Sequence, residues 1–239
     1  MTEHERTTFD VDRLVEEFKK GNERFIQSAE TKAPGVFKTR SKGQTPHTAV
    51  VECADSWVAL GLITKTPFGR IFTIAKNAAN IVDASSKETA SSATYALNHL
   101  PSVNLIVVNG HYDCGGIKGL DHLKGKNRKT GKLEDEVESH LKRALPAMQF
   151  VDRRIMAKRL PREERHNAIV EANVLLGIEN LMQIRAVREA SGKRIKIQGT
   201  VYDPFTGKLH FNYPTLEKHG LVAEAREQFR ERTRSRMMR

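Results

Sequence analysis

Cysteine is scarce in this chain of 239 residues, which contains only Cys53 and Cys114. A disulfide-rich secreted framework uses more thiols, so we expect a reducing, cytoplasmic setting. No apolar run is long enough to span a bilayer, and the charged residues 1–6 lack the apolar core of a secretory signal. The sequence therefore predicts neither a membrane protein nor a secreted one.

Aromatic residues are also few, at 6% of the chain, whereas basic residues are in excess and give a net charge of +11. Six arginines lie within residues 224–239. Because aromatic residues do not alternate with them, base stacking has little support and we do not expect nucleic-acid binding. We expect solvated surfaces and a frayed basic tail, with binding to an anionic surface through 224–239 as the alternative.

Hydrophobic periodicity predicts short strands that alternate with helices. Strands are expected at 48–53, 70–75, 104–109, 195–202 and 208–213, and helices at 10–27, 85–100, 134–148 and 163–190. This order predicts an α/β fold with a mainly parallel central sheet flanked by helices. A turn at 203–207 makes the last two strands an antiparallel edge hairpin. We expect one domain over 1–213, with an N-terminal helical arm at about 10–30, and a basic extension at 214–239.

Two motifs follow the predicted strands 48–53 and 104–109. They are Glu52-Cys53-Ala54-Asp55-Ser56 and His111-Tyr112-Asp113-Cys114-Gly115-Gly116. The carboxyl ends of parallel strands meet at one edge of a sheet, where ligands gather. We therefore expect the side chains of Cys53, Asp55, His111 and Cys114 to lie close together.

Two thiols and one imidazole are a ligand set for a borderline-soft metal ion. Three protein ligands with an open fourth position are typical of catalytic zinc, which makes a bound water acidic near neutral pH. Asp55 could instead fill the fourth position. A metal-free alternative pairs Cys53 or Cys114 with His111 as an activated nucleophile, oriented by an aspartate.

These motifs resemble those of the β-class carbonic anhydrases, whose zinc site combines Cys-x-Asp-x-Arg with His-x-x-Cys. The resemblance extends over about residues 10–213. Further matching stretches are Gly21-Asn22-Glu23-Arg24-Phe25, Lys42-Gly43-Gln44-Thr45-Pro46, Asn77-Ala78-Ala79-Asn80-Ile81-Val82, Gly115-Gly116-Ile117-Lys118-Gly119-Leu120, Glu179-Asn180-Leu181 and Gly199-Thr200-Val201-Tyr202-Asp203.

The resemblance implies that Cys53, His111 and Cys114 bind Zn²⁺ and that zinc-bound hydroxide converts CO₂ reversibly to bicarbonate, which makes the protein a lyase. It implies two catalytic side chains. Asp55 would accept a hydrogen bond from the zinc-bound water or bind the metal in a closed state, and Gln44 would reach the substrate from a partner subunit. It also implies a homodimer or a dimer of dimers. The implied substrate pocket comprises Phe72, Ala78, Tyr95, Trp57 and the Gly115 amide.

One departure from the family pattern is Trp57, which stands where the family has an arginine that clamps the aspartate. An indole has one donor and no charge, so it cannot form this clamp, and Lys76 is a candidate for a partial substitute. Three outcomes follow from the departure. The protein is a carbonic anhydrase of reduced activity, a hydrolase of carbonyl sulfide or carbon disulfide, or a zinc-binding pseudoenzyme.

Overall fold

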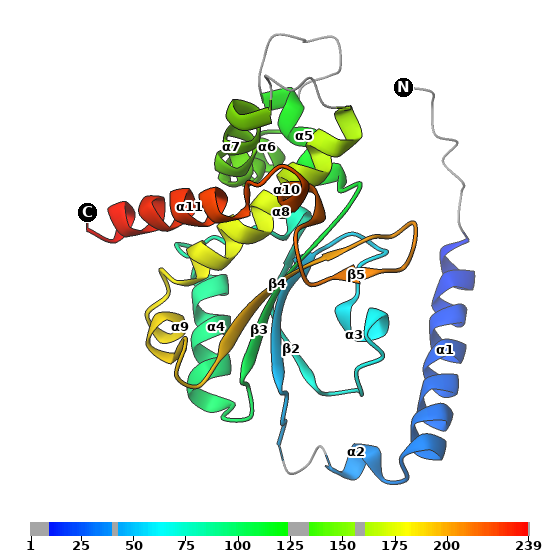
Figure 1. Cartoon of the computed structure of the whole chain (residues 1–239). Helices are drawn as coiled ribbons and strands as arrows, with labels where there is room; N and C mark the ends of the chain where they lie inside the picture. The colour runs from blue at the N-terminus through cyan, green and yellow to red at the C-terminus, as the bar shows by residue number, and fades with distance from the viewer. Residues whose placement is uncertain (1–9, 40–42, 124–133, 156–160, 239) are drawn as a thin grey trace. The chain divides into compact units, whose positions relative to one another are not determined.

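The structure is a computed structural model that describes residues 10–39, 43–123, 134–155 and 161–238 (Figure 1). The chain divides into two compact units, Met1–Gln44 and Thr45–Arg239. No helix in these described ranges is both long and apolar enough to cross a membrane.

The N-terminal unit contains α1 (Val11–Lys32) and α2 (Val36–Thr39). Asp10 caps α1 because its carboxylate accepts the backbone N–H groups of Asp12 and Arg13, each at 3.1 Å. None of the residues of α1 is buried. Its apolar side chains therefore form an exposed stripe, which comprises Val11, Val15, Phe18, Phe25 and Ile26.

The second unit is built on a five-stranded sheet of order β2-β1-β3-β4-β5. The strands are β1 (Thr48–Cys53), β2 (Ile71–Asn77), β3 (Leu105–His111), β4 (Lys196–Tyr202) and β5 (Leu209–His210). The first four are parallel and β5 is antiparallel to β4, which confirms the predicted fold class. Every residue of β1 is buried, because helices cover the apolar central strands.

Helices surround this sheet. They are α3 (Leu60–Ile63), α4 (Lys87–His99), α5 (Gly115–Leu123), α6 (Asp135–Leu141), α7 (Leu145–Ile155), α8 (Arg162–Leu181) and α9 (Arg185–Ala190), with 3₁₀ turns η2 (Ala78–Asn80) and η4 (Lys142–Ala144). The prediction of one helix over 163–190 is wrong. The chain breaks between α8 and α9, where Ile184 adopts an extended conformation and buries its side chain.

The basic C-terminal segment forms α10 (Pro214–Lys218) and α11 (Val222–Met237), so the expectation of a frayed tail is also wrong. One face of α11 is buried against α8 and α7, and Phe229 packs edge-on against Phe150 with ring centroids 5.6 Å apart (Figure 1). The burial of Ala225 and Phe229 stabilises a helix whose other faces are charged.

Candidate metal centre

Three soft donors converge at the carboxyl edge of the sheet. Cys53 is the last residue of β1 and His111 the last of β3, and these strands are hydrogen-bonded neighbours. The Sγ atoms of Cys53 and Cys114 lie 3.9 Å apart. The ligand atoms of Cys53, His111 and Cys114 all lie within 4.8 Å of one another, and all three residues are buried. The structure thus brings together residues that lie far apart in the sequence.

A sharp turn between β3 and α5 returns Cys114 toward His111. Asp113, in the middle of this turn, has a φ of +60°, in the left-handed region that a non-glycine residue seldom adopts. Its carboxylate forms an ion pair with Lys118 in α5. The turn therefore brings the thiol of Cys114 close to the imidazole of His111.

The orientation of the His111 ring leaves one nitrogen for a metal ion. Nδ1 lies 2.9 Å from the carbonyl oxygen of Tyr112, to which its N–H donates. Nε2 is buried and has no hydrogen-bond partner among the residues that the structure describes. A buried polar atom without a partner is costly, and a metal ion beside the two thiols would satisfy it.

The side chains of Cys53 and Cys114 are hydrogen-bonded to each other. The pKa of Cys53 is lowered to about 4 because the Cys114 thiol donates a hydrogen bond to it, and burial only partly opposes this. The pKa of Cys114 is raised, first because it donates that bond and second because it is buried. Burial lowers the pKa of His111, but the neighbouring Cys53 thiolate raises it overall. A bound divalent cation would hold both sulfurs as thiolates and release the proton.

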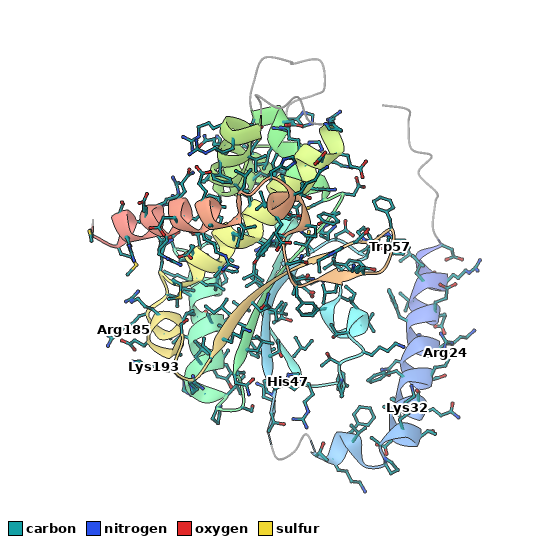
Figure 2. All side chains as sticks on the ribbon, viewed as in Figure 1. Arg24, Lys32, His47, Trp57, Arg185 and Lys193 are labelled. Atoms are coloured by element: carbon teal, nitrogen blue, oxygen red, sulfur yellow. The ribbon has the colours of Figure 1, made fainter. Side chains whose placement is uncertain are left out.

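Asp55 lies beside this cluster. Its Oδ2 is 4.0 Å from Nε2 of His111, and its Oδ1 accepts the backbone N–H of Trp57 at 2.9 Å. Trp57 is 73% exposed (Figure 2). Its described hydrogen bond to the carboxylate comes from the backbone N–H and not from the indole. The ammonium group of Lys76 contacts Glu52 at 3.0 Å and the carbonyl of Val58, so its described contacts do not include Asp55.

The other predicted site residues fall into three groups. Ala78 follows Asn77, the strand partner of Cys53, and Gly115 follows Cys114, so both lie beside the donors. Phe72 pairs with Ala49, which precedes Cys53 by four residues, or about 13 Å along the strand.

Phe72 also stacks on Tyr95 with ring centroids 6.0 Å apart. The chain therefore does not bring these two rings to its own donors. Gln44 belongs to the N-terminal unit.

The 3₁₀ turn η2 lies within the family-like stretch 77–82, and its supporting contacts could not be predicted from the sequence. The side-chain amide of Asn77 bonds both the N–H and the carbonyl of Ile81, and the amide of Asn173 donates to the carbonyl of Ala79 at 2.8 Å. Ala79 has a φ of +60° and packs against Gly116, where an added Cβ would meet the Ala79 Cβ at 3.0 Å. This element packs against the first turn of α5, next to Cys114.

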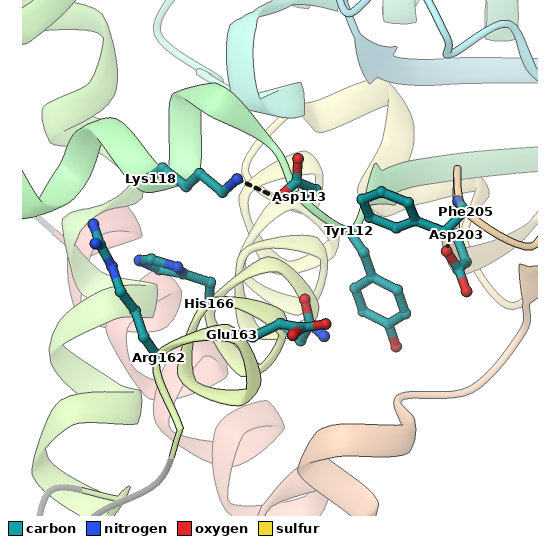
Figure 3. Close-up of a pocket in the computed structure, with 9 residues that line it drawn as sticks. Tyr112, Asp113, Lys118, Arg162, Glu163, His166, Asp203 and Phe205 are labelled. Carbon is teal, nitrogen blue, oxygen red and sulfur yellow. Dashed lines mark hydrogen bonds and ion pairs between the residues drawn. The ribbon is translucent and has the colours of Figure 1, made fainter. Parts of the chain in front are cut away.

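A cavity of about 760 Å³ adjoins the turn between β3 and α5 (Figure 3). Tyr112, Asp113 and Lys118 line it together with Arg162 and His166 of α8. None of the three donors lines it, so this cavity is separate from the candidate metal centre.

Comparison with known proteins finds similarity to carbonic anhydrases. A sequence profile described as carbonic anhydrase matches residues 48–209. "Beta carbonic anhydrase 3" of Arabidopsis thaliana is 31% identical over 193 residues, which cover 79% of this chain and 73% of that protein. A carbonic anhydrase of Helicobacter pylori is 32% identical over 201 residues, covering 77% and 83%.

The fold is similar to that of solved structures as well. One of them belongs to a study of two tetrameric β-carbonic anhydrases from Sordaria macrospora. It aligns with a TM-score of 0.70 and 26% identity, and the alignment covers 82% of this chain and 95% of that one.

Proposed function

This chain belongs to the β-class carbonic anhydrase family, and from that premise we propose that it catalyses the zinc-dependent, reversible hydration of CO₂ to bicarbonate. The observation that carries the proposal is the convergence of Cys53, His111 and Cys114, whose ligand atoms lie within 4.8 Å of one another. Two thiolates and a neutral imidazole are the donor types that zinc binds in catalytic sites with an open position.

In this proposal Cys53, Cys114 and Nε2 of His111 hold the zinc ion. The bond from Nδ1 to the Tyr112 carbonyl supports this role, because it selects the tautomer whose Nε2 lone pair faces the thiols. When bound, zinc supplies the Lewis acidity that makes water a nucleophile near neutral pH.

Asp55 is the proposed hydrogen-bond acceptor beside the metal. Its Oδ2 lies on the His111 side, and its Oδ1 is occupied by the Trp57 N–H. A carboxylate there orients a water by accepting its hydrogen bond, or it closes the site by binding the metal itself. The proposal assigns Gln44 to substrate binding and the Gly115 amide to holding the product. It assigns Trp57, Phe72, Ala78 and Tyr95 to the pocket wall.

We also propose that the protein acts as a homodimer or a dimer of dimers. The support is the exposure of the apolar side chains of Val11, Val15 and Phe18 on one face of α1, and the tetrameric state named for the relatives from Sordaria macrospora. A second subunit would explain why Phe72 and Tyr95 stack far from the donors of their own chain.

Metal analysis combined with stopped-flow CO₂ hydration tests the proposal. We expect about one zinc per chain. C53S, C114S and H111N are each expected to lose most of the metal and the activity. His47→Asn, which changes an exposed histidine outside the cluster, should keep both. Metal-free wild-type protein, or serine variants with unchanged zinc, would contradict the metal site. Zinc-loaded protein with no rate above buffer would reject the activity alone.

A further inference from the structure

The C-terminal helix α11 forms one wall of a second, smaller cavity. Its apolar face is held on the body of the protein by Phe229, and the Thr233 hydroxyl donates to the Glu179 carbonyl at 3.3 Å. This anchoring gives the charged face of α11 a defined position. Arg232 and Arg236, one turn apart, both line a cavity of about 290 Å³ next to α8, α6 and the segment after η2.

The cavity is strongly basic. Lys142 and Arg143 line it opposite the two arginines of α11, and the one acidic side chain in its lining is Asp83. Arg143 is neutralised, because its Nε lies 2.6 Å from Asp83 Oδ2. Lys142 is neutralised by Glu138 at 2.7 Å. Arg232 and Arg236 have no ion pair with any residue that the structure describes, so two positive charges remain uncompensated.

These two charges repel each other across one helical turn, an arrangement that destabilises a helix. Arg232 is exposed, but its guanidinium is partly desolvated on the cavity side, which lowers its pKa, and the charge of Arg236 lowers it further. An anion between the two guanidinium groups would relieve both costs. Neither arginine is buried, so a ligand can reach them from solvent.

The number and shape of the guanidinium N–H groups of Arg232 and Arg236 determine which kind of anion fits the cavity. Two guanidinium forks offer paired N–H groups that match the oxygens of a phosphate, and a dianion balances both charges. A singly charged bicarbonate would leave one charge uncompensated. The volume lies near the lower limit for small-molecule pockets, which suits a phosphate group and little more.

We propose that this cavity, between α11 and the segment after η2, binds a multiply charged phosphate group, either as the free ion or as the phosphoryl group of a small metabolite. Arg232 and Arg236 bind its oxygens, Lys142 and Arg143 add to the positive field, and the Asp83 carboxylate holds Arg143 in place. The site differs from the candidate metal centre and shares no residue with it.

Isothermal titration of the full chain with inorganic phosphate, at constant ionic strength and pH 7.5, tests this proposal. We expect one site per chain in the wild type. The double variant R232Q/R236Q should bind phosphate at least tenfold more weakly, and R234Q should bind it like the wild type. Arg234 is the matched control because it lies on the same helix outside the cavity lining. Glycerol 3-phosphate in place of phosphate distinguishes the two sources, since a bound metabolite predicts tighter binding of the ester.

Circular dichroism checks that the variants remain folded. If the glutamine variant unfolds, R232K/R236K, which keeps the charge but loses the forks, should weaken phosphate binding severalfold. The absence of phosphate binding by the wild type would overturn the proposal, as would unchanged binding by the folded double variant. Binding confined to a polyanion such as single-stranded RNA would overturn it too.

Discussion

Trp57 is largely exposed, and its indole lies in solvent. The Asp55 carboxylate accepts a hydrogen bond from the backbone N–H of Trp57. Trp57→Arg should add a bidentate, charge-assisted hydrogen bond of about 1.5 kcal/mol, which would hold Asp55 off the metal. We expect kcat/KM for CO₂ hydration to rise roughly tenfold, measured by stopped flow.

Trp57→Gln is the control for this substitution, because glutamine offers donors without charge and should change the rate little. Equal rates for the arginine variant and the wild type would show that the clamp is not what limits activity.

At the residue scale, the donors could be predicted because their spacing and the strand ends are visible in the sequence. Other features could not. Asp113 and Ala79 adopt positive φ values. The local sequence does not predict these values, since aspartate and alanine usually avoid them. The separation of Phe72 from Cys53 depends on strand register, which a single sequence does not determine.

Among the elements, η2 and α5 are in close contact beside the candidate metal centre. A Cβ added at Gly116 would meet the Ala79 Cβ at 3.0 Å and its backbone nitrogen at 3.2 Å. Gly116→Ala should therefore destabilise the protein by about 1–3 kcal/mol and lower its zinc content.

Gly115→Ala is the matched control, because nothing lies within 4 Å of an added Cβ at that position. Urea unfolding and metal analysis of the two variants test the difference. Equal stabilities would show that η2 yields to the extra methyl group.

Helices α5, α7 and α8 are joined by a charged cluster. Asp121 of α5 contacts Arg165 and His166 of α8 at 2.9 Å each, and Arg165 also contacts Asp152 of α7 at 2.7 Å. Burial raises the pKa of Asp121, but His166 and Arg165 outweigh it and lower the value overall. The stabilisation is therefore complete above the ordinary aspartate pKa and is lost as pH falls through the lowered one.

Asp121→Asn should reduce the free energy of unfolding by about 1 kcal/mol at neutral pH. The difference from the wild type should shrink as pH falls below about 4. Urea unfolding across pH measures this, with Asp12→Asn in the first turn of α1 as an exposed control. A difference that is independent of pH would mean that the Asp121 charge contributes nothing.

The elements were predicted best where apolar residues run continuously, as in β1 and β3. The break after Leu181 was missed because its apolar neighbours continue the helical pattern, and only tertiary packing of Ile184 turns the chain. The helix α11 was missed for the opposite reason. Most of its residues are charged, and only a short face with Ala225 and Phe229 is buried. The aromatic partner of Phe229 lies in α7, far away in the sequence.

For the whole molecule, the exposed stripe on α1 predicts self-association. Phe18, which is 77% exposed, lies at helical spacing with Val11 and Val15. Phe18→Ser should weaken the proposed dimer at least tenfold, since burying a Phe side chain contributes about 1.5–3 kcal/mol. Analytical ultracentrifugation over a concentration series measures this.

Lys20→Ser, on the opposite face of α1, is the control and should leave association unchanged. A wild-type chain that sediments as a monomer at all concentrations would contradict the assembly.

The order of the strands in the sheet has a consequence for biosynthesis. β3 lies between β1 and β4, yet β4 ends only at Tyr202, late in the chain. While the ribosome extends the polypeptide, one edge of the apolar β3 stays without its neighbour until the last fifth of the protein emerges. An open apolar edge invites aggregation. Yields of the nascent protein should therefore depend on chaperones that shield it until β4 arrives.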